Sequence, residues 1–141
     1  MRILILHVDY FKCEITEKGR SKIAEEYTSP VTEINEALII LSSVEKQDEV
    51  SPEKIAQNSV KEITNLAEKV KTKNIVLHPF AHLFGELSTP QVAIQVLKIM
   101  ESELIQKGFN TIRTPFGWFN TLEIKAKGHP LSRVARIIKV D

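Results

Sequence analysis

Three of the four histidines lie in or beside irregular segments that separate apolar runs of the chain. The segments are residues 78–86, 115–120 and 127–131. Each combines Pro or Gly with an aromatic residue or a histidine, and irregular segments between buried strands often hold the residues that bind or react. His78, His82 and His129 can therefore act as general bases, metal ligands or hydrogen-bond donors. A satisfied loop histidine and a plain Pro-Phe-Gly turn are the alternative interpretation of the same residues.

A metal site is the first chemistry to test against this pattern. His78, His82 and Glu86 would share one face of a helix and could then hold a cation together. Pro79 follows His78 directly, and proline disfavours such a helix. Cys13, the single cysteine, excludes an internal disulfide and any multi-cysteine metal site. We therefore expect no metal and no other cofactor.

Other common chemistries lack their sequence signals. The chain contains no Gly-x-Ser-x-Gly elbow, which disfavours a serine hydrolase of that type. Its five glycines form neither a phosphate-binding loop nor a dinucleotide-binding fingerprint. The sequence therefore disfavours an NTPase and a Rossmann enzyme.

Apolar runs and alternating segments predict seven strands. They are residues 1–7, 11–17, 36–44, 74–78, 110–114, 119–125 and 133–140. The first two are separated by so few residues that they should form a hairpin or a sharply bent pair. The polar stretch 18–35 indicates a loop. The continuous apolar run within 36–44 indicates a central strand covered on both faces.

Two helices are predicted between these strands. Ser51-Pro52 and Thr89-Pro90 each combine a capping hydroxyl with a proline at the first helical position. Apolar residues then recur at helical spacing as far as Val70 and Ile105, and Gly108 is suited to end the second helix. The element order predicts one α+β domain over residues 1–141, with a mixed sheet and both helices on one face.

Composition narrows the possible partners. The chain is 43% apolar and 26% charged, as expected of a soluble globular domain, and its longest apolar runs are too short to span a membrane. No signal peptide is evident, so we expect a cytoplasmic protein without membrane contact. The net charge of +1 disfavours a generic nucleic-acid binder, although residues 110–141 hold six basic and two acidic side chains. A local basic face near phosphates and ordinary solvated strand faces both fit that distribution.

Five segments in order resemble the N-terminal editing domain of archaeal threonyl-tRNA synthetases. They read MRILILHVDY (residues 1–10), SVE (43–45), PFAHL (79–83), PFGW (115–118) and KGHPL (127–131). The resemblance covers essentially the whole chain. It implies a fold similar to that of D-aminoacyl-tRNA deacylases, a homodimer, and a place at the N-terminus of a longer synthetase, whose other parts would bind ATP.

The resemblance also implies a reaction. Such domains hydrolyse L-seryl-tRNA(Thr), because a synthetic site rejects a substrate that lacks one methyl group by only about 1–3 kcal/mol. An aminoacyl ester is already activated, so a positioned water, backbone groups and the terminal ribose 2′-hydroxyl can suffice. The partner is then the acceptor end of tRNA(Thr), and no metal is needed.

Several residues are identified by position in this resemblance. Val44 is expected beside the terminal adenosine. The expected seryl pocket has two walls, one made of Pro79, Ala81 and His82 and the other of Phe116, Gly117 and Phe119. His82, Asn120 and Arg133 occupy the expected catalytic positions.

Two of these positions depart from the family's pattern. Asn120 stands where the family usually has lysine, and Arg133 stands where it usually has glutamate. Asparagine can form hydrogen bonds but carries no charge, and arginine cannot accept a hydrogen bond. Two alternatives to an active editing hydrolase are therefore open. One is a weakened module that binds the acceptor end or a dimer partner, and the other is a D-aminoacyl-tRNA deacylase.

Overall fold

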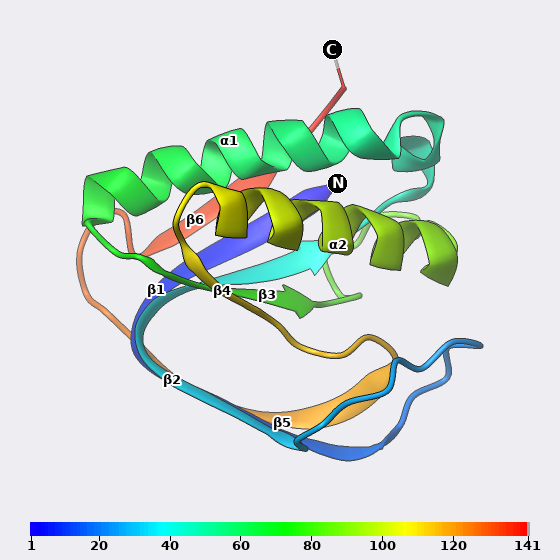
Figure 1. The fold of residues 1–141 in the computed structure, drawn as a ribbon, viewed down its shortest axis with the longest axis horizontal. Coiled ribbons are helices and arrows are strands. Elements are labelled where there is room, and N and C mark those ends of the chain that lie inside the picture. Colours follow the sequence, from blue (N-terminus) through cyan, green and yellow to red (C-terminus); the bar gives the residue numbers. More distant parts are fainter. Residues whose placement is uncertain (141) are drawn as a thin grey trace.

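A single sheet with two helices on one face forms the molecule, as Figure 1 shows for the computed structural model, which describes residues 1–140. Its strands are β1 (Arg2–Lys18), β2 (Val31–Ser43), β3 (Asn74–Pro79), β4 (Asn110–Arg113), β5 (Trp118–Ala126) and β6 (Arg133–Ile137). The strand order is β4-β3-β2-β1-β5, with β6 also paired to β1. β2, β3 and β4 are parallel and the other pairings are antiparallel, so the predicted mixed α+β sheet is confirmed.

The antiparallel ladder of β1 and β2 is the longest pairing and is sharply bent. β1 is one continuous strand, so the hairpin expected between residues 1–7 and 11–17 is wrong and the bent alternative is confirmed. The bend coincides with a register shift between Val8 and Tyr10 on the β5 side, and with Glu36 of β2, whose φ is +48°. The start and the finish of β2 consequently lie on the same side of the molecule, each in a different layer (Figure 1).

The sequence prediction differs from the structure mainly at the first residues of β2. Residues 31–35 were expected in a loop, but they pair with β1. Their side chains are mostly polar and face solvent on one side, so the hydrophobic signal of a strand is weak there. β6 also ends at Ile137, three residues before the expected end of that strand.

The helices α1 (Pro52–Val70) and α2 (Pro90–Gln106) cover one face of the sheet, as expected (Figure 1). Thr89 caps α2 by accepting from the N–H of Val92, whereas Ser51 makes no side-chain cap, so that part of the prediction is wrong. A short 3-10 helix, η1 (Lys46–Val50), precedes α1. Among the residues described, no helix is both long and apolar enough to cross a membrane.

Two apolar clusters lie on opposite faces of the sheet. One fills the space between the sheet and the helices, with Ile5, Leu38 and Ile40 facing α1 and α2. The other lies on the opposite face of the same strands and includes Phe11 and Ile39. Alternate residues of β1 and β2 serve the two clusters, as the two-residue period of a strand requires. The second cluster therefore joins the two layers that the bend creates.

A buried positive charge completes the core. The Met1 ammonium group is fully buried, lies 2.8 Å from the Asp48 carboxylate and donates to the carbonyl of Ile138. Asp48 is 1% exposed and also accepts from the backbone N–H of Glu45 at 2.7 Å. Buried charges are tolerated where a partner is present, and removal of one partner is costly.

Replacing Asp48 by asparagine should therefore destabilise the fold. Asp48→Asn keeps the shape of the side chain but leaves the Met1 ammonium without its nearest negative charge. We expect a loss of about 3 kcal/mol in the free energy of unfolding, measured by urea denaturation. The exposed carboxylate of Glu14 provides the control, since Glu14→Gln should change stability by less than about 0.5 kcal/mol. Equal, small effects of both substitutions would contradict this account.

Candidate functional site

The carboxyl ends of three parallel strands converge at one edge of the sheet. Ser42 of β2 pairs with Pro79 of β3, and Leu77 of β3 pairs with Arg113 of β4. Ligands of open sheets commonly bind outside such carboxyl ends, because the loops that leave neighbouring strands meet there. β2 is followed by Val44, β3 ends at Pro79, and Phe116 lies in the turn after β4. The structure therefore brings these three predicted residues to one edge.

The segment after β3 extends this edge into solvent. Ala81 and His82 are both exposed, and the His82 ring lies edge-on to the Phe80 ring with 5.3 Å between their centroids. The carbonyl of Leu83 accepts from the Arg2 guanidinium at 3.1 Å. His82 is therefore accessible to a substrate and is oriented by a neighbouring ring.

Val44 can contribute only backbone groups at this edge. Its side chain is 4% exposed and packs in the apolar cluster beneath the helices. Its carbonyl accepts from the N–H of Ser88 at 3.1 Å, which ties the end of β2 to the segment after β3. Any contact of Val44 with a ligand would therefore not depend on its side chain.

The turn after β4 lies beside the carboxyl edge of the sheet. The N–H of Phe116 donates to Glu25 at 2.9 Å, and Arg113 also pairs with Glu25. Burial acts to raise the pKa of Glu25, but the Arg113 guanidinium and the Phe116 N–H outweigh burial and hold it below its ordinary value. Gly117 has a φ of +93°, and a Cβ there would lie 2.4 Å from the carbonyl oxygen of Ile23. The glycine is thus required for packing against residues 19–27.

The start of β5 lies at the same end of the molecule, in the other layer (Figure 1). Phe119 is 49% exposed, and Asn120 is half-buried opposite Ile15 of β1. The Asn120 amide donates weakly to the carbonyl of Trp118 at 3.4 Å, so its own carbonyl oxygen remains available. The bend therefore brings Phe119 and Asn120 toward the end where Val44 and Pro79 lie.

Within one chain, Arg133 does not lie at the end of the molecule where Val44 and Pro79 lie. It is exposed and pairs with Leu6 of β1, whereas Arg2, which contacts the His82 segment, lies four residues earlier on that strand. Four residues of a strand span roughly 13 Å. Arg133 thus lies toward the bend, away from the carboxyl edge of the sheet.

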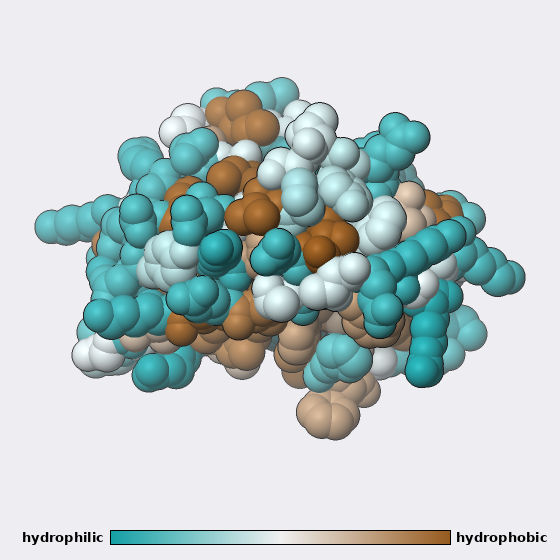
Figure 2. Space-filling view, turned by 90° about the horizontal axis from the view of Figure 1, so that it is seen from below, coloured by the Kyte–Doolittle hydropathy of each residue, from teal (hydrophilic) through white to brown (hydrophobic). Residues whose placement is uncertain are grey.

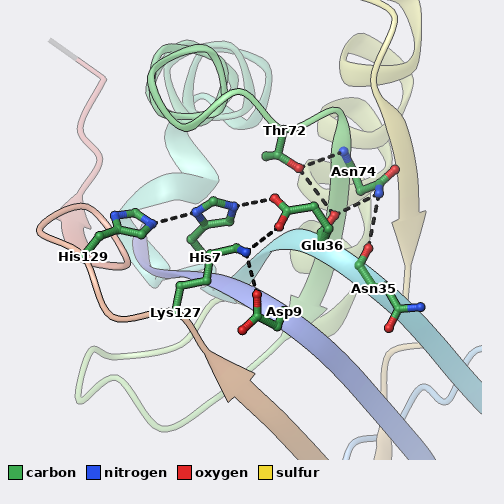
Figure 3. A network of polar contacts seen from close by, with 8 residues as sticks. All are labelled: His7, Asp9, Asn35, Glu36, Thr72, Asn74, Lys127 and His129. Atoms are coloured by element: carbon green, nitrogen blue, oxygen red, sulfur yellow. Dashed lines mark hydrogen bonds and ion pairs between the residues drawn. The ribbon is translucent and has the colours of Figure 1, made fainter.

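A network of polar side chains fixes the segment that precedes Arg133 (Figure 3). His7 is 4% exposed and lies between His129 at 2.8 Å and Glu36 at 2.7 Å. His129 Nδ1 accepts from the N–H of Leu131, so in the neutral ring Nε2 carries the proton and donates to His7. His7 then donates to Glu36 through its other nitrogen.

The same network includes a cation. Lys127 lies 2.6 Å from Glu36 and also pairs with Asp9. Burial acts to raise the pKa of Glu36, but hydrogen bonds from Lys127 and His7 prevail and lower it. His7 and Glu36 were not singled out by the sequence, because 29 residues separate them and neither belongs to an irregular segment with a motif.

His78 has a structural role in this fold. It is 2% exposed, and its Nδ1 lies 2.8 Å from the hydroxyl of Thr114. Burial lowers the pKa of His78 to about 4, so the ring is neutral at physiological pH. His78 and His82 thus differ sharply, although they are separated by only three residues.

A cavity lies beside this edge rather than within it. Its volume is about 420 Å³, and its lining includes Tyr27, Thr32 and Pro115. His82, Asn120 and Arg133 are not among the residues that line it. This cavity therefore does not hold the three residues that were expected to be catalytic.

Known proteins resemble this chain along its whole length. Residues 1–138 match the model of a family described as the archaea-specific editing domain of threonyl-tRNA synthetase. The threonine–tRNA ligase of Methanobrevibacter smithii is 43% identical over 143 aligned residues, which cover 100% of this chain and 23% of that protein. That of Methanocaldococcus jannaschii is 44% identical, covering 98% of this chain and 22% of that protein. The chain therefore spans less than a quarter of these relatives.

The fold also has a solved counterpart. The structure of a c-Myc DNA Unwinding Element Binding Protein superposes with a TM-score of 0.65 and covers 99% of both chains. Sequence identity is 13%, so this similarity concerns the fold alone. The expected D-aminoacyl-tRNA deacylase-like architecture is confirmed.

Burial of His78 predicts a pH dependence of stability. The unfolded chain binds a proton near pH 6.5, whereas folded His78 binds one only near pH 4. Burial of neutral His78 does not reduce the free energy of unfolding above pH 6.5. As the pH falls from 6.5 toward 4, the free energy of unfolding decreases by about 3 kcal/mol in total. His78→Gln should remove that decline, seen as a flatter curve of unfolding free energy against pH. Because Glu25 and Glu36 titrate in both proteins, the difference between the two curves is the measurement, and parallel curves would contradict the assignment.

Proposed function

Because the chain belongs to the family of archaea-specific editing domains of threonyl-tRNA synthetases, we propose that it hydrolyses L-seryl-tRNA(Thr). The observation that supports this proposal most is the meeting of Val44, Pro79 and Phe116 at the carboxyl edge of the sheet. The terminal adenosine would lie beside the backbone of Val44, and the seryl group beside Ala81 and His82.

The mechanism we propose relies on a positioned water. An aminoacyl ester needs no covalent activation, so attack by water requires proton transfer and stabilisation of the oxyanion that forms on the ester carbonyl. Backbone N–H groups of the loop after β3 suit the oxyanion, because this loop is irregular and its residues 81–82 face solvent. The 2′-hydroxyl of the terminal ribose would help to orient the water.

Two of the three side chains that were expected to be catalytic have a role in this mechanism. His82 is exposed and can accept a proton or orient the water. Asn120 offers a carbonyl oxygen and an amide near the substrate's hydroxyl, without the charge of a lysine. Arg133 lies toward the bend in one chain, so the proposal does not require it to contact the ester.

Homodimerisation is part of the proposal. Large apolar side chains remain exposed, among them Ile137 at 60% and Leu122 at 41%. Figure 2 shows apolar side chains gathered in the middle of one face among hydrophilic ones. A second copy that covers such a patch would remove it from water.

The second candidate is a module that binds the acceptor end without catalysis. Two observations favour it: Asn120 lacks a charge, and Arg133 lies away from His82. Such a module would retain the carboxyl edge and the loops but hydrolyse no ester.

Rates of ester hydrolysis decide between these candidates. We expect the chain to accelerate deacylation of L-seryl-tRNA(Thr) and to leave L-threonyl-tRNA(Thr) largely intact, measured as loss of labelled amino acid. Uncatalysed decay of both esters would exclude the hydrolase. Activity that arises only in Asn120→Lys with Arg133→Glu would identify a weakened module, and preference for a D-seryl ester would identify a D-aminoacyl-tRNA deacylase.

His82 should contribute to the rate without being indispensable. Water, backbone groups and the ribose hydroxyl share the work, so His82→Ala should slow seryl-ester hydrolysis by about tenfold, less than the loss of a sole general base. Phe84 of the same loop is 98% exposed, and Phe84→Ala should keep the wild-type rate as a control. Complete loss of activity in His82→Ala alone would instead make His82 an essential base.

A further inference from the structure

Glu45 is a buried carboxylate for which the proposed mechanism has no use. It directly follows Val44 and is 2% exposed. Its Oε1 makes no hydrogen bond, although the Met1 ammonium lies 3.4 Å away. Its Oε2 lies 3.1 Å from Arg2 Nε. A carboxylate in this position is costly unless its charge is balanced, so its surroundings require an explanation.

Gly85 lies directly against this carboxylate. A Cβ built on Gly85 would lie 1.2 Å from Oε2 of Glu45 and 2.3 Å from its carboxyl carbon. No side chain fits at residue 85 unless Glu45 or the loop moves. The Glu45 carboxylate therefore determines how closely the segment after β3 approaches the end of β2.

Backbone pairing extends this contact on both sides. Glu45 and Leu87 form an isolated antiparallel bridge. The backbone N–H of Lys46 donates to the backbone carbonyl of Glu86 at 2.8 Å, and that of Ser88 donates to the backbone carbonyl of Val44 at 3.1 Å. Residues 44–46 and 86–88 thus lie side by side, and Glu45 is at the centre of the pairing.

Arg2 connects the same carboxylate to the loop that holds His82. Its Nε faces Glu45, while its NH1 donates to the carbonyl of Leu83 at 3.1 Å. Glu45 therefore acts on the loop at two points, directly at Gly85 and through Arg2 at Leu83. Val44 is the proposed adenosine contact, and residues 81–82 form one wall of the proposed seryl pocket. The position of that wall relative to the adenosine and to Phe116 therefore depends on this contact.

We propose that Glu45 is a positioning residue that fixes residues 81–82 relative to Val44. It thereby sets the width of the seryl pocket between residues 81–82 and Phe116, and with it the discrimination between seryl and threonyl esters. The inference rests on the proposed function. The two substrates differ by one methyl group, and a site that widens by a fraction of that size admits the larger one. A methylene group in a fitted pocket corresponds to roughly 10- to 200-fold in specificity.

The test compares two variants with two matched controls. Glu45→Gln removes the charge that holds Arg2, and Gly85→Ala forces the carboxylate and the loop apart. Gly128→Ala adds a Cβ that meets nothing within 4 Å, and Glu86→Gln removes an exposed charge from the same loop. Rate constants for hydrolysis of seryl-tRNA(Thr) and threonyl-tRNA(Thr) are measured for each variant. The melting temperature of each variant shows whether it is folded.

We expect the seryl-to-threonyl ratio of rate constants to fall by about tenfold in Glu45→Gln and Gly85→Ala and to stay unchanged in both controls. Glu45→Asp shortens the side chain and retracts the carboxylate. Adding it to Gly85→Ala should restore part of the ratio, which a general loss of stability would not do. An unchanged ratio in both folded variants, with an active wild type, would overturn the inference.

Hydrogen exchange provides a readout that does not depend on activity. The N–H of Ser88 and of Lys46 should exchange faster in Glu45→Gln than in Glu86→Gln, because their backbone pairing relies on Glu45. If the wild type hydrolyses neither ester, the proposed function fails, and this measurement still decides whether Glu45 holds the loop. Equal exchange in both variants would overturn that role, and Glu45→Asp serves as the second variant if Glu45→Gln does not fold.

Discussion

The bend in the β1–β2 ladder gives this fold its two layers (Figure 1). A straight ladder of this length would place the two ends of β2 at opposite ends of the molecule. The bulge after Val8 and the left-handed backbone of Glu36 fold the ladder over, and the network of His7, Lys127 and His129 lies at the same point. The two layers then enclose the apolar cluster around Phe11, which offsets the cost of the bend.

The bend also explains why a site can form from distant segments. The carboxyl ends of β2, β3 and β4 meet at one edge, and the start of β5 lies toward the same end in the other layer (Figure 1). Backbone groups dominate this edge, because Val44 is buried and residues 81–82 belong to an irregular loop. Such a site suits an ester that needs positioning rather than a strong nucleophile. In our proposal, the placement of residues 81–82 by Glu45 and Gly85 matters more than any one side chain.

Local patterns were sufficient to predict most of the elements. Apolar periodicity identified both helices and the buried strands, and the Thr89-Pro90 pair marked the start of α2 correctly. Residues 31–35 were missed because their pairing with β1 depends on the bend rather than on their own polar sequence. The loops of the candidate site could be recognised from the sequence, since Pro, Gly and His mark them, and their role as a site stays a prediction. Glu45 with Gly85 and His7 with Glu36 could not be recognised, because each contact joins residues 29 or more positions apart.

We place the substrate's aminoacyl end at the carboxyl edge of β2, β3 and β4. A crystal structure of the chain with a non-hydrolysable seryl-adenosine amide would locate it. We predict that the adenosine lies against the backbone of Val44 and that the seryl group lies between Ala81–His82 and Phe116, within hydrogen-bonding distance of backbone N–H groups. Binding of the analogue in the cavity beside Tyr27 and Pro115, or beside Arg133 at the bend, would contradict the account.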